Sequence, residues 1–313
     1  MPAESLDRRV AGDLPLLRAA FEASGSGRWV IRAIVELGLD RSNGFRLQLD
    51  LADDQVQGGL QATEARLAAA TAEVVDTDWL SIARCRRSGI PLAAAVPYGA
   101  IFGGLVARRD GISRLRWLAD LPGRRIGVVH PDDKNWQLLR AACQLRHGFD
   151  PDTACTRFDA GSKTTLRQQL TSGTVDAALL YWHQVPALLA TGDFVEVCDL
   201  LDLLPMLGVR TVPSTFFVFP DALLAARPDL VRGFGRAVQA AVRVLHEDAQ
   251  VWHTVTGTAA DDPAASSLRA KWLARVRSEW TADMRTDLAD LARFLGAAEL
   301  PPGVFAPGFL SES

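Results

Sequence analysis

Apolar and polar positions along the chain repeat with two different periods, which predicts a succession of strands and helices. Short apolar runs after turn-forming residues are typical of strands covered on both faces, and apolar residues three or four positions apart are typical of amphipathic helices. The strands predicted in this way are residues 14–21, 45–51, 92–96, 125–129, 153–159, 194–198 and 214–219. Helices are predicted between them and from Asp221 onward. This alternation indicates an α/β protein with mainly parallel sheets flanked by helices.

One helix–turn–strand unit occurs twice in the sequence. Residues 67–79 read LAAATAEVVDTDW and residues 170–182 read LTSGTVDAALLYW, so that leucines, threonines, acidic residues and tryptophans align at a constant offset. In each copy a tryptophan, Trp79 or Trp182, stands at the C-terminal end of the predicted strand. Ligands bind at these strand ends in open α/β sheets, so two such ends indicate a cleft between two similar lobes. The alternative is that both tryptophans are ordinary core residues.

The length of the chain predicts more than one folding unit, because 313 residues exceed the usual size of a single hydrophobic core. We predict a first lobe made of residues 1–108 and 209–313, and a second lobe made of residues 109–208. No low-complexity linker separates the halves. The chain is therefore expected to cross between the lobes through strands near 105–109 and 208–214.

Composition and charge exclude several classes of protein. A net charge of −3 and a pI near 6.0 argue against a nucleic-acid-binding protein, which needs a basic face. No apolar run approaches the roughly 20 residues that a membrane helix requires. The four cysteines are far apart and include no CxxC pair, which argues against a zinc site but leaves disulfides and buried thiols both open. The first residues lack the apolar core of a secretory signal, so we expect either that a signal was removed or that the protein is cytoplasmic.

Four loops are expected to meet at the cleft, and they carry aromatic rings together with a few polar groups. The expected ligand-binding residues are Ser26, Gly27, Arg28, Thr77, Asp78, Trp79, Tyr98, Lys134, Asn135, Trp136, Tyr181, Trp182 and His183. The turn at residues 24–28 opens a helix whose free N–H groups can bind an anion. Lys134 opens another helix, where the helix dipole disfavours a cation. Ordinary structural interpretations are open as well: a helix cap at each turn, a solvated lysine, and a core tryptophan beside a surface histidine.

The sequence shows no nucleophile elbow, no metal-ligand spacing and no phosphate loop. Aromatic surface with a few polar groups is typical of a binding site rather than of a catalytic one. We therefore expect no catalytic residue, no bound metal and no enzyme activity.

Two segments resemble known motifs of solute-binding proteins. Gly111 and Ile112, followed by LADLPGRRIGV at residues 118–128, resemble the stretch I-x-S-L-A-D-L-K-G-K-K-I-G-V, and LTSGTVD at residues 170–176 resembles A-L-x-x-G-x-V-D-A. Over most of residues 14–250 the chain is similar to the nitrate/sulfonate/taurine-type binding proteins of ABC transporters. The resemblance implies a two-lobed periplasmic-binding-protein fold of type II that closes on its ligand by a hinge. It also implies a periplasmic location and a membrane permease as partner, and we expect a monomer.

Within this family, the motifs DTDWL, DKNWQLL and YWH resemble a subgroup linked to pyrroloquinoline quinone. The resemblance implies this quinone as a bound ligand and not as a catalytic cofactor. Its flat ring would stack on the tryptophans of the three motifs, and its carboxylates would bind helix N-termini and cations such as Arg28 or His183. The amine of Lys134 could pair with a ligand carboxylate or add reversibly to a quinone carbonyl.

Two considerations oppose this ligand or this function. Asp76, Asp78, Asp132 and Asp133 make the cleft less cationic than a trianion requires, so a neutral or cationic ligand is favoured if they face the site. The family also has cytoplasmic enzyme relatives of the thiamine-pyrimidine and menaquinone-pathway types, although the cysteine-rich motif of the pyrimidine enzymes is not found in this sequence. An enzyme on the same fold is thus the alternative function.

Overall fold

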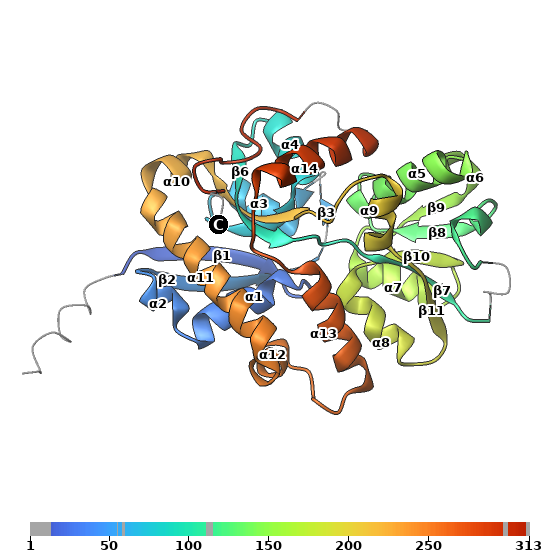
Figure 1. Cartoon of the computed structure of the whole chain (residues 1–313), viewed down its shortest axis with the longest axis horizontal. Helices are drawn as coiled ribbons and strands as arrows, with labels where there is room; N and C mark the ends of the chain where they lie inside the picture. Colours follow the sequence, from blue (N-terminus) through green and yellow to red (C-terminus); the bar gives the residue numbers. More distant parts are fainter. Residues whose placement is uncertain (1–13, 55, 58–59, 111–114, 297–299, 311–313) are drawn as a thin grey trace, which may run out of the picture.

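Two sheets form the centres of two lobes that lie side by side in the computed structural model (Figure 1). The structure describes residues 14–54, 56–57, 60–110, 115–296 and 300–310. Two parts of the sequence interpretation lie outside these ranges, namely residues 1–13 of the predicted first lobe and Gly111-Ile112 of the matched motif.

The first lobe contains a parallel pair of strands next to a three-stranded antiparallel group. β1 (Leu16–Glu22) pairs with β2 (Arg46–Ala52), and β12 (Thr215–Pro220) lies between β5 (Val75–Asp78) and β6 (Leu92–Gly99). A parallel bridge between Ala19 and Val74 joins the two groups next to β5. The resulting strand order is β2-β1-β5-β12-β6.

The second lobe repeats this arrangement in one five-stranded sheet. Its order is β11 (Phe194–Asp199), β7 (Gly104–Arg108), β10 (Ala177–Leu180), β8 (Arg125–Val128) and β9 (Thr156–Asp159). β8 is parallel to β9 and β10, whereas β7 is antiparallel to β10 and β11. Each sheet therefore holds one antiparallel strand, β12 or β7, that comes from a crossing between the lobes.

The repeat found in the sequence corresponds to equivalent parts of the two lobes. The first copy forms α3 (Ala62–Ala68) and β5, and the second forms α7 (Lys163–Thr171) and β10. The first crossing lies slightly away from its predicted position. β7 pairs within the second sheet, so the chain leaves the first lobe between Gly99 and Gly104, several residues before the predicted boundary at 108/109.

Helices cover both sheets, and one of them lies between the lobes. The elements not yet named are α1 (Gly27–Glu36), α2 (Leu39–Ser42), β3 (Val56–Gln57), β4 (Leu60–Gln61), α4 (Trp79–Arg87), η2 (Leu118–Asp120), α5 (Lys134–His147), α6 (Pro151–Ala154), η3 (Trp182–Gln184), α8 (Val185–Leu189), η4 (Leu200–Asp202), α9 (Leu203–Met206), α10 (Asp221–Ala226), α11 (Pro228–Glu247), α12 (Ala249–Thr256), α13 (Pro263–Arg275) and α14 (Ala282–Phe294). α13 packs against α8 and η3 of the second lobe (Figure 1). There Lys271 binds Glu196 and Asp199 of β11, at 2.9 and 2.7 Å. No helix within the described ranges is long and apolar enough to cross a membrane.

Candidate functional site

The C-terminal ends of β1, β5 and β10 and the starts of α5 and α7 meet between the lobes around a small cavity of about 50 Å³. The residues that line it are Glu22, Gly25, Ser26, Gln61, Asp76, Thr77, Asp78, Ile101, Lys134, Lys163, Tyr181, His183 and Thr215. Both lobes contribute polar side chains, as expected for a site at the ends of two equivalent sheets.

Two ion pairs cross this cavity from one lobe to the other. The ammonium group of Lys163 binds the carboxylate of Glu22, and Lys134 Nζ lies 3.6 Å from Asp78 Oδ2. The lysines are only 6% and 7% exposed, so the interpretation of Lys134 as a solvated surface lysine is wrong. Lys163 Nζ also lies 4.2 Å from the centre of the Tyr181 ring, within the range of a cation–π contact.

Helix capping orients two carboxylates at or near the cavity, those of Asp78 and Asp133. Asp78 accepts hydrogen bonds from the N–H groups of Leu80 and Ser81, each at 3.0 Å, at the start of α4. Burial opposes ionisation of Asp78, but the positive charges of Lys134 and Arg84 outweigh it and hold its pKa below the usual value. Asp78 is therefore ionised and already has its partners.

Asp133 caps α5 in the same way, through the N–H of Asn135 at 2.8 Å. The Tyr181 hydroxyl donates a hydrogen bond to the other oxygen of Asp133 at 3.3 Å. The Asn135 amide oxygen in turn accepts from the Gly103 N–H at 2.9 Å, which ties the start of α5 to the first crossing. Asn135 thus has a structural role next to the cavity and does not line it.

Asp76 differs from these carboxylates because it has no partner. No other residue in the described part of the chain donates a hydrogen bond to its carboxyl group or forms an ion pair with it. Burial, with the nearby charge of Glu22, raises its pKa to about 7. The carboxyl group lies against Gly27, where an added Cβ would be 2.3 Å from Asp76 Oδ2. Glycine at the start of α1 therefore makes room for this side chain.

Two more polar groups of the cavity lack partners. Thr215 is 5% exposed, and its hydroxyl forms no hydrogen bond with any described residue. The same holds for both ring nitrogens of His183. Burial, together with the charge of Lys163, lowers the pKa of His183 to about 3, so its imidazole is neutral at physiological pH. The cavity therefore offers unsatisfied hydrogen-bonding capacity beside an unpaired carboxyl group.

The structure places only part of the expected site around the cavity. Six expected residues line it, namely Ser26, Thr77, Asp78, Lys134, Tyr181 and His183. Tyr98 is fully buried behind Ser26 and donates a hydrogen bond to its hydroxyl at 3.0 Å. Arg28 donates from Nε to the Gly25 carbonyl at 3.2 Å and does not line the cavity.

The expectation that tryptophan rings border the cavity is wrong in this structure. Trp79, Trp136 and Trp182 are each 0% exposed, and none of them is among the lining residues. Trp79 begins α4, which turns its ring into the hydrophobic core, and Trp182 packs edge-on against Trp29 with 5.9 Å between ring centres. Trp136 donates a hydrogen bond to Asp152 at 3.0 Å. The interpretation of these rings as core residues is the one that the structure supports.

Several lining residues were not among the expected ligand-binding residues, namely Glu22, Gly25, Gln61, Asp76, Ile101, Lys163 and Thr215. Asp76 was considered only as one of four acidic residues that could face the cleft. A signal for Asp76 was present in the repeat. At the constant offset of the two copies, Asp76 aligns with Leu179 of β10, so an acidic residue occupies a position that is apolar in the other copy.

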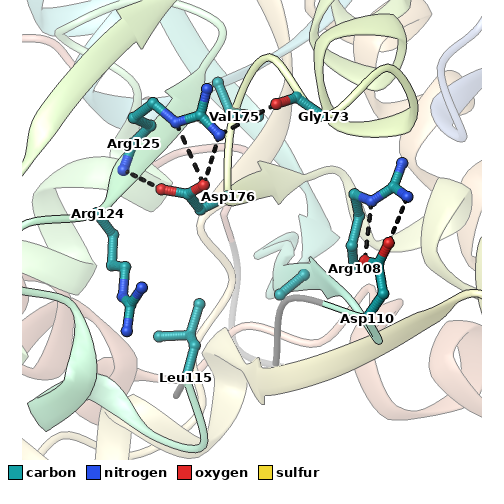
Figure 2. Close-up of a pocket in the computed structure, with 9 residues that line it drawn as sticks. Arg108, Asp110, Leu115, Arg124, Arg125, Gly173, Val175 and Asp176 are labelled. Carbon is teal, nitrogen blue, oxygen red and sulfur yellow. Dashed lines mark hydrogen bonds and ion pairs between the residues drawn. The ribbon is translucent and has the colours of Figure 1, made fainter. Parts of the chain in front are cut away.

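A larger surface hollow of about 350 Å³ lies at the other end of the second sheet (Figure 2). Its charged side chains are engaged with one another: Arg108 Nη2 binds Asp110 at 2.7 Å, and Arg125 Nη2 binds Asp176 at 2.7 Å. Only the second lobe contributes to it, at the N-terminal ends of β8 and β10. The smaller interlobe cavity is therefore the better candidate site.

Comparison with solved structures identifies the fold. The alkanesulfonate-binding protein SsuA from Xanthomonas axonopodis pv. citri, bound to MOPS, is 17% identical, with a TM-score of 0.71 over 97% of this chain and 100% of that chain. The periplasmic aliphatic sulphonate-binding protein SsuA from Escherichia coli is 15% identical, with a TM-score of 0.67 over 93% and 95%. The ligand-binding component of an ABC-type import system from Staphylococcus aureus is 11% identical, with a TM-score of 0.73 over 95% and 98%. The predicted periplasmic-binding-protein fold is confirmed.

Sequence comparison identifies the family. No curated protein matches the chain. The sequence model of the NMT1/THI5-like family, however, matches residues 63–250, which is more than half of the 313 residues and includes both copies of the repeat. The match and the fold confirm, at the level of the family, the resemblance to binding proteins of the nitrate/sulfonate/taurine type. The chain belongs to the NMT1/THI5-like family.

Proposed function

We propose that this protein is the solute-binding component of an ABC importer, which captures a small solute between its lobes and delivers it to a membrane permease. The observation that carries the proposal is the cavity at the ends of β1, β5 and β10, because it is built from both lobes and holds unpaired polar groups. The Escherichia coli relative is a periplasmic sulphonate-binding protein. By analogy, we propose a periplasmic location and a monomeric protein.

The proposal includes hinge closure, which the way in which the cavity is built supports. Its walls belong to two lobes joined by the crossings between β6 and β7 and between α9 and β12. Rotation about these crossings would separate the walls and admit a solute. The ion pairs Lys163–Glu22 and Lys134–Asp78 would form only as the lobes approach each other, so they would favour the closed arrangement.

Pyrroloquinoline quinone remains the ligand suggested by the sequence motifs, and the geometry gives it little support. Pockets for ligands of this size usually have volumes of roughly 300–1,000 Å³, well above the 50 Å³ of this cavity. The tryptophan rings expected to stack on the quinone are buried in the hydrophobic cores. Lys134, expected to bind or attack the ligand, is paired with Asp78. These features favour a smaller solute without three negative charges.

The alternative of an enzyme on the same fold finds no specific support at the cavity. Lys134 and Lys163, the two amines of the lining, both sit in ion pairs, and Asp78 is held as a helix cap. No cysteine lines the cavity within the described part of the chain. We therefore propose binding without chemical conversion.

A binding experiment tests the proposal directly. Solute retained by the purified protein is extracted, identified by mass spectrometry and titrated back by calorimetry, while small-angle scattering records any compaction. Pyrroloquinoline quinone is titrated into wild type and Lys134→Ala in parallel, with absorbance as a second readout.

The isosteric change Thr215→Val removes the unpaired hydroxyl of the cavity, and Thr171→Val, at the exposed end of α7, is the matched control. We expect about tenfold weaker solute binding only in Thr215→Val, the effect of losing one hydrogen bond. Absence of any retained or bound solute, with unchanged scattering, would contradict the proposed function. Equal loss in both variants would place the site elsewhere.

A further inference from the structure

The charges that line the cavity do not balance. The lining contains three carboxyl groups and two ammonium groups. Lys163 pairs with Glu22 and Lys134 pairs with Asp78, which leaves Asp76 without a counter-charge. His183 does not supply one, because burial and the charge of Lys163 lower its pKa to about 3. The cavity is thus short of one positive charge.

The residues behind the cavity do not correct this imbalance. Glu64 is buried next to the lining, where its carboxylate accepts a hydrogen bond from the Thr77 hydroxyl at 2.6 Å. Arg84 lies on the same side, close enough to influence Glu64 and Asp78, and its guanidinium donates to Ser81 at 2.7 Å. The cations that influence Asp76 are the same two lysines that already neutralise other carboxylates.

The fold does not require an acidic residue at this position. In the second copy of the repeated unit the equivalent residue is Leu179, which is 1% exposed and packs in the hydrophobic core. Asp76 is the second residue of the four-residue strand β5, and Leu179 is the third residue of the four-residue strand β10. Asp76 also depends on Gly27, because any larger residue there would collide with its carboxyl group. Asp76 is half-buried, and an unpaired carboxyl group that has lost part of its hydration lowers stability. This cost favours a role for Asp76 in binding.

The polar groups near Asp76 define which hydrogen bonds a ligand in the cavity must form. Thr215 lines the cavity and is 5% exposed, and its buried hydroxyl has no hydrogen-bond partner among the described residues. A neutral imidazole such as that of His183 has one nitrogen that accepts a hydrogen bond. Together with the Asp76 carboxylate, these groups present acceptors to the cavity. A partner with N–H donors would satisfy them, whereas a quaternary ammonium group has no such donor.

We propose that the solute captured in this cleft carries a positively charged, N–H-bearing group of the ammonium or amidinium type, which binds the Asp76 carboxylate and donates to the Thr215 hydroxyl. The inference rests on the proposed function and specifies its ligand class. Hydrogen bonds between a charged donor and a charged acceptor are about twice as strong as neutral ones. The lysine–carboxylate pairs stay intact in this arrangement, because the ligand supplies the one charge that is missing.

The test uses three small probes: acetamidinium, tetramethylammonium and methanesulfonate. They are titrated by calorimetry into wild type, Asp76→Asn and Asp176→Asn at pH 8, above the pKa of about 7 to which burial raises Asp76. Asp176 is the matched control, since it lies at the opposite end of the second sheet and pairs with Arg125 (Figure 2). Circular dichroism confirms that each variant is folded.

We expect acetamidinium to bind wild type and Asp176→Asn equally, and to bind Asp76→Asn at least about tenfold more weakly. Tetramethylammonium and methanesulfonate should not bind. The inference is overturned if acetamidinium fails to bind wild type at the highest concentration that leaves the fold intact, or binds Asp76→Asn equally well. A neutral or anionic solute recovered from the protein would also overturn it, yet would leave the proposed function standing. If no solute of any class binds, both fall.

Discussion

Replacing Asp76 by Asn is expected to change how the stability of the protein depends on pH. Burial, reinforced by Glu22 and partly offset by Lys163, raises the pKa of Asp76 from the usual 3.8 to about 7. A pKa that is higher in the folded than in the unfolded state means that the folded protein holds a proton that the unfolded chain has released. As far as Asp76 is concerned, the protein is therefore most stable at pH values below the pKa of this residue in the unfolded chain. This stability is lost as the pH rises from there through the folded-state pKa of about 7.

The size of this loss follows from the shift in the pKa. A shift of about three pH units at about 1.4 kcal/mol per unit corresponds to about 4 kcal/mol of unfolding free energy. Part of this loss occurs below pH 5, and water that enters the cavity beside Asp76 reduces the remainder, so we expect a loss of about 1–3 kcal/mol between pH 5 and pH 8. Asparagine has nearly the same shape and does not ionise. The stability advantage of Asp76→Asn over wild type should therefore grow by about this amount between pH 5 and pH 8.

The assay is urea unfolding, followed by tryptophan fluorescence, of wild type and Asp76→Asn at pH values from 5 to 8. Asp176→Asn is the control, because hydrogen bonds from Arg125 outweigh the burial of Asp176 and lower its pKa. Its carboxylate stays ionised throughout this range, so any effect of the control variant should be constant. Parallel pH profiles for wild type and Asp76→Asn would refute the reasoning and show that water or a neighbouring charge neutralises Asp76.

Three further changes test the packing and the ion pairs around the cavity. Gly27→Ala forces the Asp76 carboxyl group to move and should lower stability by about 1–3 kcal/mol and solute affinity by about tenfold; unchanged affinity in calorimetry would separate Asp76 from the ligand. Trp136→Ala leaves a cavity at a fully buried position and should lower the free energy of unfolding in urea by about 3–5 kcal/mol. Weaker solute binding by the variant that remains folded would instead indicate that this ring contacts the ligand. Lys163→Met leaves Glu22 unpaired and should cost about 3–5 kcal/mol. The double variant with Glu22→Gln should recover part of this cost, and strictly additive costs would mean that the two groups do not interact.

The periodicity of the sequence predicted most of the sheet strands, because the burial of a strand depends on its own residues and on their immediate turns. The strand predicted at residues 214–219 is β12, for example, and the one at 45–51 is β2. The prediction was weaker at residues 153–159, because helix α6 extends to Ala154 and β9 begins only at Thr156. There Asp150 caps a short helix that begins with proline, a local signal that the apolar pattern does not contain.

The location of the candidate cavity was also predictable, but the residues that line it were not. The repeat located two equivalent strand ends, and the cavity lies where they meet. The sequence assigned the aromatic rings to the ligand because they follow the strands directly. In the structure the first residue of the next helix turns into the core, so that Trp79 and Trp182 are buried. The prediction that Lys134 reacts with a ligand carbonyl stays a prediction, with its ammonium group now placed beside Asp78.

The sequence by itself determined the alternation of strands and helices, the internal duplication and therefore the two-lobed α/β architecture, since each depends on patterns within short segments. Only the tertiary structure decided which charges meet. Glu22 and Lys163 are 141 residues apart in the chain, and Asp78 and Lys134 belong to different lobes. Charge pairing depends on distance in space, which a linear pattern does not contain. For the same reason, only the folded chain shows that, of the three carboxyl groups that line the cavity, Asp76 is the one left without a partner.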